Sequence, residues 1–195
     1  MGMYSDLQNR ALGKPSKPTF RSFLRARSGA AAVEFALLAI PFFFVVFAII
    51  ETAIVMAAGI MLDNAVNDVA RRVMTGEVQA SNLDAADFRS LVCGGVTTLM
   101  SCNKVKIDLR TYPAANAIPR SVTLKLGTVD DSKFCFDPGS QDTITVLRAF
   151  YEWPYVASML SNLVKDTNGN AVLFSMAAFM NEPFGSTASS KSTCS

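Results

Sequence analysis

The sequence predicts an α+β protein in which one long N-terminal helix is followed by a small domain with an antiparallel sheet of about four strands. Apolar residues run almost without interruption from Phe35 to Ile50 and then continue with helical spacing as far as Val73. Beyond residue 100 the apolar residues alternate with polar ones, which is typical of half-buried strands. A chain of 195 residues has room for one modest domain beside such a helix, and its net charge of +2 favours no class of partner.

The apolar run is long enough to cross a membrane. From Ala30 to Ile50 there are 21 residues, which as a helix measure roughly 31 Å, close to the bilayer core of about 30 Å. Elsewhere the chain has no stretch that is long and apolar enough for a second crossing. We therefore expect a single transmembrane span at residues 30–50.

The helix is expected to continue past the membrane to about Thr75, where Gly76 suits a helix C-terminus. Apolar residues recur there at four-three-four spacing, at Leu62, Val66, Val69 and Val73. Polar and charged residues fill the opposite side, so this part of the helix is amphipathic. Its apolar face is expected to pack against the domain that follows.

A basic leader precedes the span at residues 1–29. Asp6 is its one acid, whereas its cations are Arg10, Lys14, Lys17, Arg21, Arg25 and Arg27. The positive-inside rule then keeps the N-terminus cytoplasmic and exports the chain after Leu62. A nucleic-acid-binding arm is disfavoured because no aromatic residues interleave the cations. A secretory signal peptide ranks second, because its apolar core is usually shorter, about 7–15 residues.

The exported domain, residues 76–184, is expected to start with a helix and continue with strands. Ser81 or Asn82 can cap that helix, and Phe88, Leu91 and Val92 give it one apolar face. Alternation predicts strands at Val105–Arg110, Val122–Leu126, Thr143–Tyr155 and Ala171–Met180. Turns are expected at Asp137–Ser140 and Thr167–Asn170, and a short helical turn at Ser158–Val164. The Ser/Thr-rich tail, residues 185–195, is expected to be loose.

Glu34 lies just inside the span, five residues after Gly29. An acid is disfavoured at the centre of a membrane helix but costs less near its end. Together with the basic leader, Gly29, Ala30 and Glu34 resemble the processing site of type IV prepilins and pseudopilins. The resemblance implies that a prepilin peptidase cuts after Gly29, so that Ala30 becomes the N-terminus and Glu34 the fifth residue. The alternative is an uncleaved signal anchor with a tolerated acid near its mouth.

Further motifs extend the resemblance beyond the helix, over most of the chain from Ser28 to Phe184. Their order is similar to that of the TadE-like pseudopilins of the tight-adherence (Tad/Flp) pilus system, which implies a pilin-like fold. The motifs are Cys93-Gly94-Gly95, Cys102 with its basic strand, Asp137-Pro138-Gly139, Tyr151-Glu152-Trp153-Pro154 and Asn181-Glu182-Pro183-Phe184. Cys135 and Cys194 do not match the family pattern.

All four cysteines follow the span, on the side expected to be oxidising, and their even number suggests disulfides. Cys93 with Cys102 is the preferred pair because the two close a short loop. Cys135 with Cys194 is less certain, since four cysteines allow three pairings and free buried thiols are the alternative. No zinc or other metal site is expected, because the chain has no CxxC motif and no His.

The composition points away from catalysis and from a cofactor. Without His, the Ser-His and Cys-His arrangements are excluded, and no phosphate-binding Gly loop is present. Glu152 is better interpreted as a structural residue at a strand edge than as a catalytic acid. The motif from Asn181 to Phe184 is likewise better interpreted as a packing element.

The resemblance implies a minor pilin or pseudopilin that helps to assemble or initiate a pilus, with Glu34 pairing with the N-terminal amine of a neighbouring subunit. The implied partners are prepilin peptidase, other pilin and pseudopilin subunits, the inner-membrane assembly platform and the lipid bilayer, with no nucleic acid. The implied location is the bacterial inner membrane, with the domain in the periplasm or carried into the surface pilus. The alternative is an uncleaved, single-span anchored periplasmic binding or sensor module.

Overall fold

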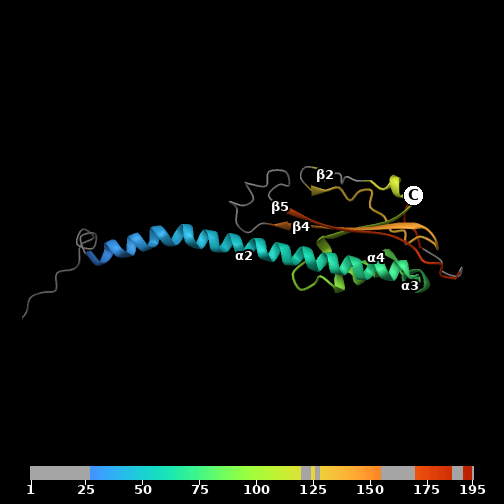
Figure 1. Ribbon diagram of the computed structural model, residues 1–195, viewed down its shortest axis with the longest axis horizontal. Helices are drawn as coiled ribbons and strands as arrows, with labels where there is room; N and C mark the ends of the chain where they lie inside the picture. The colour runs from blue at the N-terminus through green and yellow to red at the C-terminus, as the bar shows by residue number, and fades with distance from the viewer. Residues whose placement is uncertain (1–26, 120–123, 126–127, 155–169, 186–190, 195) are drawn as a thin grey trace, which may run out of the picture. The chain divides into compact units, whose positions relative to one another are not determined.

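The computed structural model describes residues 27–119, 124–125, 128–154, 170–185 and 191–194, and it confirms the α+β class (Figure 1). A long helix, α2 (Arg27–Met74), precedes a small domain with an antiparallel sheet of three strands. The chain divides into two compact units, Met1–Phe47 and Ala48–Ser195. The first part of α2, which includes Pro41, belongs to the first unit.

The sheet is formed by β1 (Val105–Tyr112), β4 (Ile144–Pro154) and β5 (Asn170–Met180), in the order β1-β4-β5. All neighbours are antiparallel, with Val105 opposite Tyr151 and Ile144 opposite Met180. These three strands confirm three of the four predicted ones, with ends that differ by one or two residues.

The predicted strand at Val122–Leu126 does not join this sheet, so the expectation of about four strands was wrong. Its described part is the two-residue strand β2 (Leu124–Lys125), which pairs with β3 (Thr128–Val129) in a separate hairpin. The physical reason is local: Leu124 pairs with Val129 and Lys125 with Thr128, and so short a loop costs less entropy to close than a pairing with the more distant sheet.

An ion pair holds this hairpin to the chain that follows it. Lys125 Nζ lies 2.7 Å from Asp130 Oδ2. The hydrogen bond from Lys125, followed by those from Ser132, lowers the pKa of Asp130 to about 2. Asp130 therefore stays ionised at any pH at which the domain is expected to work.

The first helix of the domain starts later than predicted. A single turn, α3 (Glu77–Ala80), follows α2, and α4 (Ala85–Gly94) is capped by Asp84 rather than by Ser81 or Asn82. The Asp84 carboxylate accepts hydrogen bonds from the backbone N–H groups of Ala86 and Asp87, both at 2.9 Å. The bond from Asp87 is the main reason that the pKa of Asp84 is lowered. Asn82 instead takes a left-handed conformation with φ 55°, in the turn before the cap.

Two of the predicted features lie wholly or mostly outside the described residues. These are the helical turn at Ser158–Val164 and the turn at Thr167–Asn170, of which Asn170 alone is described, as the first residue of β5.

The core of the second unit lies between the helices and one face of the sheet. The predicted stripe on α2 is confirmed, since Leu62, Val66, Val69 and Val73 are at most 2% exposed. They share one buried cluster with Phe88 and Val92 of α4 and with inward residues of the sheet. Figure 1 shows α2 and α4 on the same side of β4 and β5. The apolar residues that recur with helical spacing on α2 thus line one side of the core.

The other face of the sheet carries a buried ion-pair network centred on Asp108. The Asp108 carboxylate is fully buried and accepts hydrogen bonds from Arg148 Nη2 at 2.5 Å and Nε at 3.1 Å. It also accepts from Arg110 Nε and from the Cys135 N–H, both at 3.0 Å. Because a buried charge is costly unless it is paired and hydrogen-bonded, these four contacts tie β1, β4 and the segment around Cys135 into one structure.

This network generates a stability prediction. In Arg148→Met, Asp108 stays buried without its main partner, which costs about 3–5 kcal/mol of unfolding free energy. The matched control is Arg72→Met, which breaks the exposed pairs with Asp68 and Glu77 and costs about 1 kcal/mol or less. Thermal unfolding of the detergent-solubilised chain measures both, and equal shifts for the two variants contradict the assignment.

Candidate processing and assembly site

Gly29, Ala30 and Glu34 lie in the first turns of α2, in the first unit. Gly29 is half-buried, whereas Ala30 and Glu34 are exposed. Ala30 and Glu34 are four residues apart, so they lie on the same helix face, about 6 Å apart along the axis. Among the described residues no cation pairs with Glu34. This end of the helix therefore presents a solvent-exposed carboxylate near the predicted cut.

The helix that follows exposes large apolar side chains on all sides. Their exposed fractions reach 73% at Leu38 and fall no lower than 41% at Phe44 among Val33, Phe35, Leu37, Leu38, Ile40, Phe42, Phe43, Phe44, Val45 and Phe47. A helix that is apolar all round is stable inside a membrane or a helix bundle. In the described part of the chain, one helix, from Gly29 to Met74, is long and apolar enough to cross a membrane, with a mean hydropathy of 2.7 in its most apolar window.

Two disulfides hold the second unit, and the described residues contain no free cysteine. Cys93 of α4 is joined to Cys102, just before β1, with their Cα atoms 5.4 Å apart. Cys135 is joined to Cys194, with a Cα–Cα distance of 5.1 Å. The first is the pair that the sequence favoured, and the second is the pair that was less certain from the sequence.

The second disulfide also fixes the end of the tail that was expected to be loose. Next to Cys194, the Thr193 N–H donates to the Phe136 carbonyl at 2.8 Å. The Phe136 N–H in turn donates to the Thr193 hydroxyl at 2.9 Å. Residues 193 and 194 are therefore held beside residues 135–137 by two hydrogen bonds and a disulfide.

The two motifs at residues 137–140 and 181–184 meet at the C-terminal end of α2. The Pro138 carbonyl accepts hydrogen bonds from Gln79 Nε2 and from Asn181 Nδ2, both at 2.9 Å. The Glu182 N–H donates to the Met74 carbonyl, one of the last in α2, also at 2.9 Å. These contacts confirm that the Asn181–Phe184 motif is a packing element.

A glycine is needed at this junction. Gly76 has φ +78°, and a Cβ added there would collide with the Phe184 ring. Any other residue at position 76 is therefore strained both by its backbone conformation and by the ring above it.

Glu152 has a structural role, as predicted. Its Oε1 accepts a hydrogen bond from the Val129 N–H at 2.9 Å and lies 3.2 Å from Lys106 Nζ. The first contact fastens β3 to the central sheet, and the second joins β1 to β4 within that sheet. Neighbouring Trp153 packs against the core, so this motif also serves the fold.

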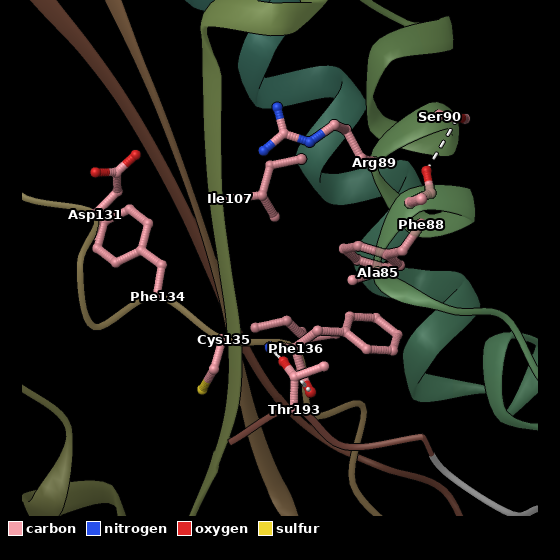
Figure 2. A pocket seen from close by; sticks show the side chains of 12 residues that line it. Ala85, Phe88, Arg89, Ser90, Ile107, Asp131, Phe134, Cys135, Phe136 and Thr193 are labelled. Carbon is pink, nitrogen blue, oxygen red and sulfur yellow. Dashed lines mark hydrogen bonds between the residues drawn. The ribbon is translucent and has the colours of Figure 1, made fainter. Parts of the chain in front are cut away.

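A groove of about 660 Å³ lies between α4, β1 and the segment at residues 131–136. Figure 2 shows Phe88 and Arg89 on one side of β1 and Asp131 and Phe134 on the other. Its polar groups are engaged in the fold: the Arg89 guanidinium donates to the Val105 carbonyl at 2.8 Å, and Ser90 donates to the Ala86 carbonyl. Among the described residues, no cluster of His, Cys, Asp and Glu is arranged to hold a metal ion.

Sequence reasoning missed Gln79 and the Asp108–Arg148 pair. Asp108 occupies a polar position of an alternating strand, which normally faces water, and its partner is forty residues away. Opposite signs on two predicted antiparallel strands were the available signal, but using it required the register that places Asp108 opposite Arg148. Nothing in the sequence indicated that Gln79 is buried and bonds to the Pro138 carbonyl.

The fold and the site define a class of protein with one apolar helix, capable of spanning a membrane, in front of a small α+β domain. Within this class, the family model described as TadE-like protein matches residues 29–71, which include Gly29, Ala30 and Glu34. The match, which covers less than a quarter of the chain, supports a similarity to the TadE-like proteins of the Tad pilus system. Neither the curated proteins nor the solved structures gave a match.

The disulfide geometry generates a second prediction. The two bonds span sequence separations of 9 and 59 residues, for which loop-closure entropy predicts stabilisation of about 3 and about 4 kcal/mol. Replacing Cys135 and Cys194 with Ser should therefore lower the unfolding temperature more than replacing Cys93 and Cys102. Non-reducing peptide mapping first establishes the pairs, and the reverse order of stability contradicts the loop argument.

Proposed function

We propose that this chain is a minor pilin or pseudopilin that takes part in assembly or initiation of a Tad/Flp-type adhesion pilus after cleavage by a prepilin peptidase. The observation that carries the proposal is the family match, which covers Gly29, Ala30 and Glu34 at the head of an exposed apolar helix. A basic leader before the match and a disulfide-bonded domain after it support the same function.

In this proposal the chain is first a membrane protein. The leader, residues 1–29, stays in the cytoplasm, residues 30–50 cross the bacterial inner membrane, and the domain, residues 76–184, is periplasmic. That orientation puts all four cysteines in an oxidising compartment, in accord with the two disulfides. The peptidase cuts after Gly29 and leaves Ala30 as a free N-terminus.

The cut chain is then extracted by the inner-membrane assembly platform. Lipid tails are as apolar as the helix surface, so moving α2 from lipid into a bundle of subunits gains little from hydrophobic burial. The gain must come from close packing and from polar pairs. Glu34 supplies such a pair with the new amine of a neighbouring subunit, because both groups need a partner in a water-poor environment.

A second candidate is an uncleaved, single-span anchored binding or sensor module. The observation that favours it is the groove of about 660 Å³ in the exported domain. The mass of the membrane-extracted chain separates the two functions, because only the first removes residues 1–29.

The processing step is tested by Gly29→Arg. A bulky cation beside the cut should block the peptidase, so the longer precursor accumulates in the membrane. Gly185→Arg is the matched control, since an added Cβ there meets nothing within 4 Å and the site is remote from the cut. N-terminal sequencing should show Ala30 in the wild type and in the control, whereas an unprocessed wild type sinks the proposal.

The assembly step is tested by Glu34→Gln, which keeps size and hydrogen bonding but removes the charge. Insertion and cleavage should be normal, because removing an acid eases partitioning into the membrane. Surface pili should be lost, since an unpaired buried amine costs about 3–5 kcal/mol per subunit. The control is Asp63→Asn, an exposed acid on the same helix. Counts of pili and of mature subunit are made in the same cells, and wild-type piliation of Glu34→Gln refutes the role of Glu34.

A further inference from the structure

The outer face of β5 is apolar and uncovered. Phe174 is 48% exposed, Met176 46% and Met180 57%, and Ala178 between them is exposed as well. These four residues alternate along the strand, so they lie on one face of the sheet, and we call them the β5 stripe. The intervening residues, such as Leu173 and Phe179, face the core instead.

The cover over this face of the sheet ends at the neighbouring strand. Phe150 of β4 lies opposite Phe174 and is 1% exposed, and Arg148 lies opposite Met176 and is 8% exposed. Phe134 packs on Phe150, with ring centroids 5.4 Å apart. The segment that buries the outer face of β4 therefore leaves the adjacent β5 stripe in the open.

The backbone edge of β5 is open on the same residues. Asn181 directly follows the strand, and its N–H bonds to the Thr143 carbonyl on the β4 side. Because N–H and C=O groups alternate in direction along a strand, the odd-numbered residues of β5 bond to β4. The even-numbered residues, which carry the β5 stripe, direct their N–H and C=O groups away from β4. Within the described chain, β4 is the strand that pairs with β5.

The opposite edge of the sheet, formed by β1, is by contrast covered by the segment at residues 135–137. The Leu109 N–H donates to the Cys135 carbonyl at 3.0 Å, and the Asp137 N–H donates to the Leu109 carbonyl at 2.7 Å. Arg89 covers the Val105 carbonyl. Two common protections of a free edge are missing from β5, since no charge and no Pro occur from Asn170 to Met180.

The direction of β5 excludes a closed pair of β5 strands from two copies of this chain. The bond from Glu182 to Met74 places the ends of β5 and α2 together, so both run the same way within the second unit. An antiparallel β5 pair would point the two α2 helices in opposite directions, which one shared membrane orientation forbids. A parallel pair about a two-fold axis fails too, because hydrogen-bonded residues of parallel strands are offset by one.

We propose that the free edge of β5 receives an extended, uncharged apolar strand from a different protein of the pilus. This inference rests on the proposed function for the identity of the partner. The added strand pairs with the N–H and C=O groups of the even-numbered residues, and its side chains on the outer face extend the β5 stripe. The match is one of charge and pattern, because a charged residue in the added strand would lie against Phe174, Met176 or Met180.

The test uses the full chain in cells, with a photo-reactive p-benzoylphenylalanine in place of Met176. The expected product is an adduct with a different pilus protein, mapped by mass spectrometry to an uncharged, alternating apolar segment. Adding Ala178→Pro removes one outward N–H without touching the bonds to β4, and should lower the adduct yield about tenfold or more.

A second variant guards against misfolding. Phe174→Lys places a charge on the β5 stripe and should abolish the adduct, whereas Leu99→Lys, at another exposed apolar residue, should leave it unchanged. Native disulfides in every variant, read by non-reducing peptide mapping, show that the domain is folded. An unchanged adduct in Ala178→Pro or in Phe174→Lys, an adduct with a second copy of this chain, or adducts with lipid alone would overturn the proposal.

N-terminal sequencing of the same samples separates the two levels of the account. A chain cut after Gly29 that forms pili but gives no protein adduct refutes the strand addition alone. An uncut chain in cells without pili refutes the proposed function instead.

Discussion

The apolar side chains of α2 between Val33 and Phe47 are exposed and must be kept out of water. Burying each of them is worth about 1.5–3 kcal/mol, so ten such residues dominate where this chain can reside. A bilayer and a bundle of similar helices satisfy the requirement about equally well, and the difference between them rests on packing and on polar groups. A single acid such as Glu34 can then contribute much of the free-energy difference between the bilayer and the helix bundle.

The domain beyond the span is built so that the end of α2 and the sheet keep a fixed relation. Asp108 draws two strands and the segment around Cys135 together, and that segment is also held by the disulfide to Cys194. Pro138 joins the end of α2 to the residue after β5 through the side chains of Gln79 and Asn181. Gln79, Asp108 and Asn181 are each at most 2% exposed, so these contacts are shielded from water.

Local patterns were enough to predict the long apolar helix, the apolar stripe at Leu62 to Val73 and three strands, because each of these depends on residues that are near one another in the sequence. Periodicity was not enough where a contact depends on residues that are far apart in the sequence. The strand around Leu124 pairs with β3 in a local hairpin instead of with the sheet, and the Asp108–Arg148 pair exists only in one register. The cap at Asp84 was one of several neighbouring candidates, and local backbone geometry chose among them. For Gly29 and Glu34, the sequence pattern remains the main source of the roles proposed for them, and the structure adds that Gly29 is half-buried and Glu34 exposed.

In the proposed function, the apolar part of α2 leaves lipid and becomes buried among other pilus subunits. The most direct measurement places a photo-reactive residue at Leu38, the most exposed large apolar position of α2, and compares adducts in membranes and in sheared pili. The account predicts lipid adducts in the membrane fraction and adducts with pilus subunits in the filament fraction. Lipid adducts alone, with the chain confined to the membrane fraction, would contradict it.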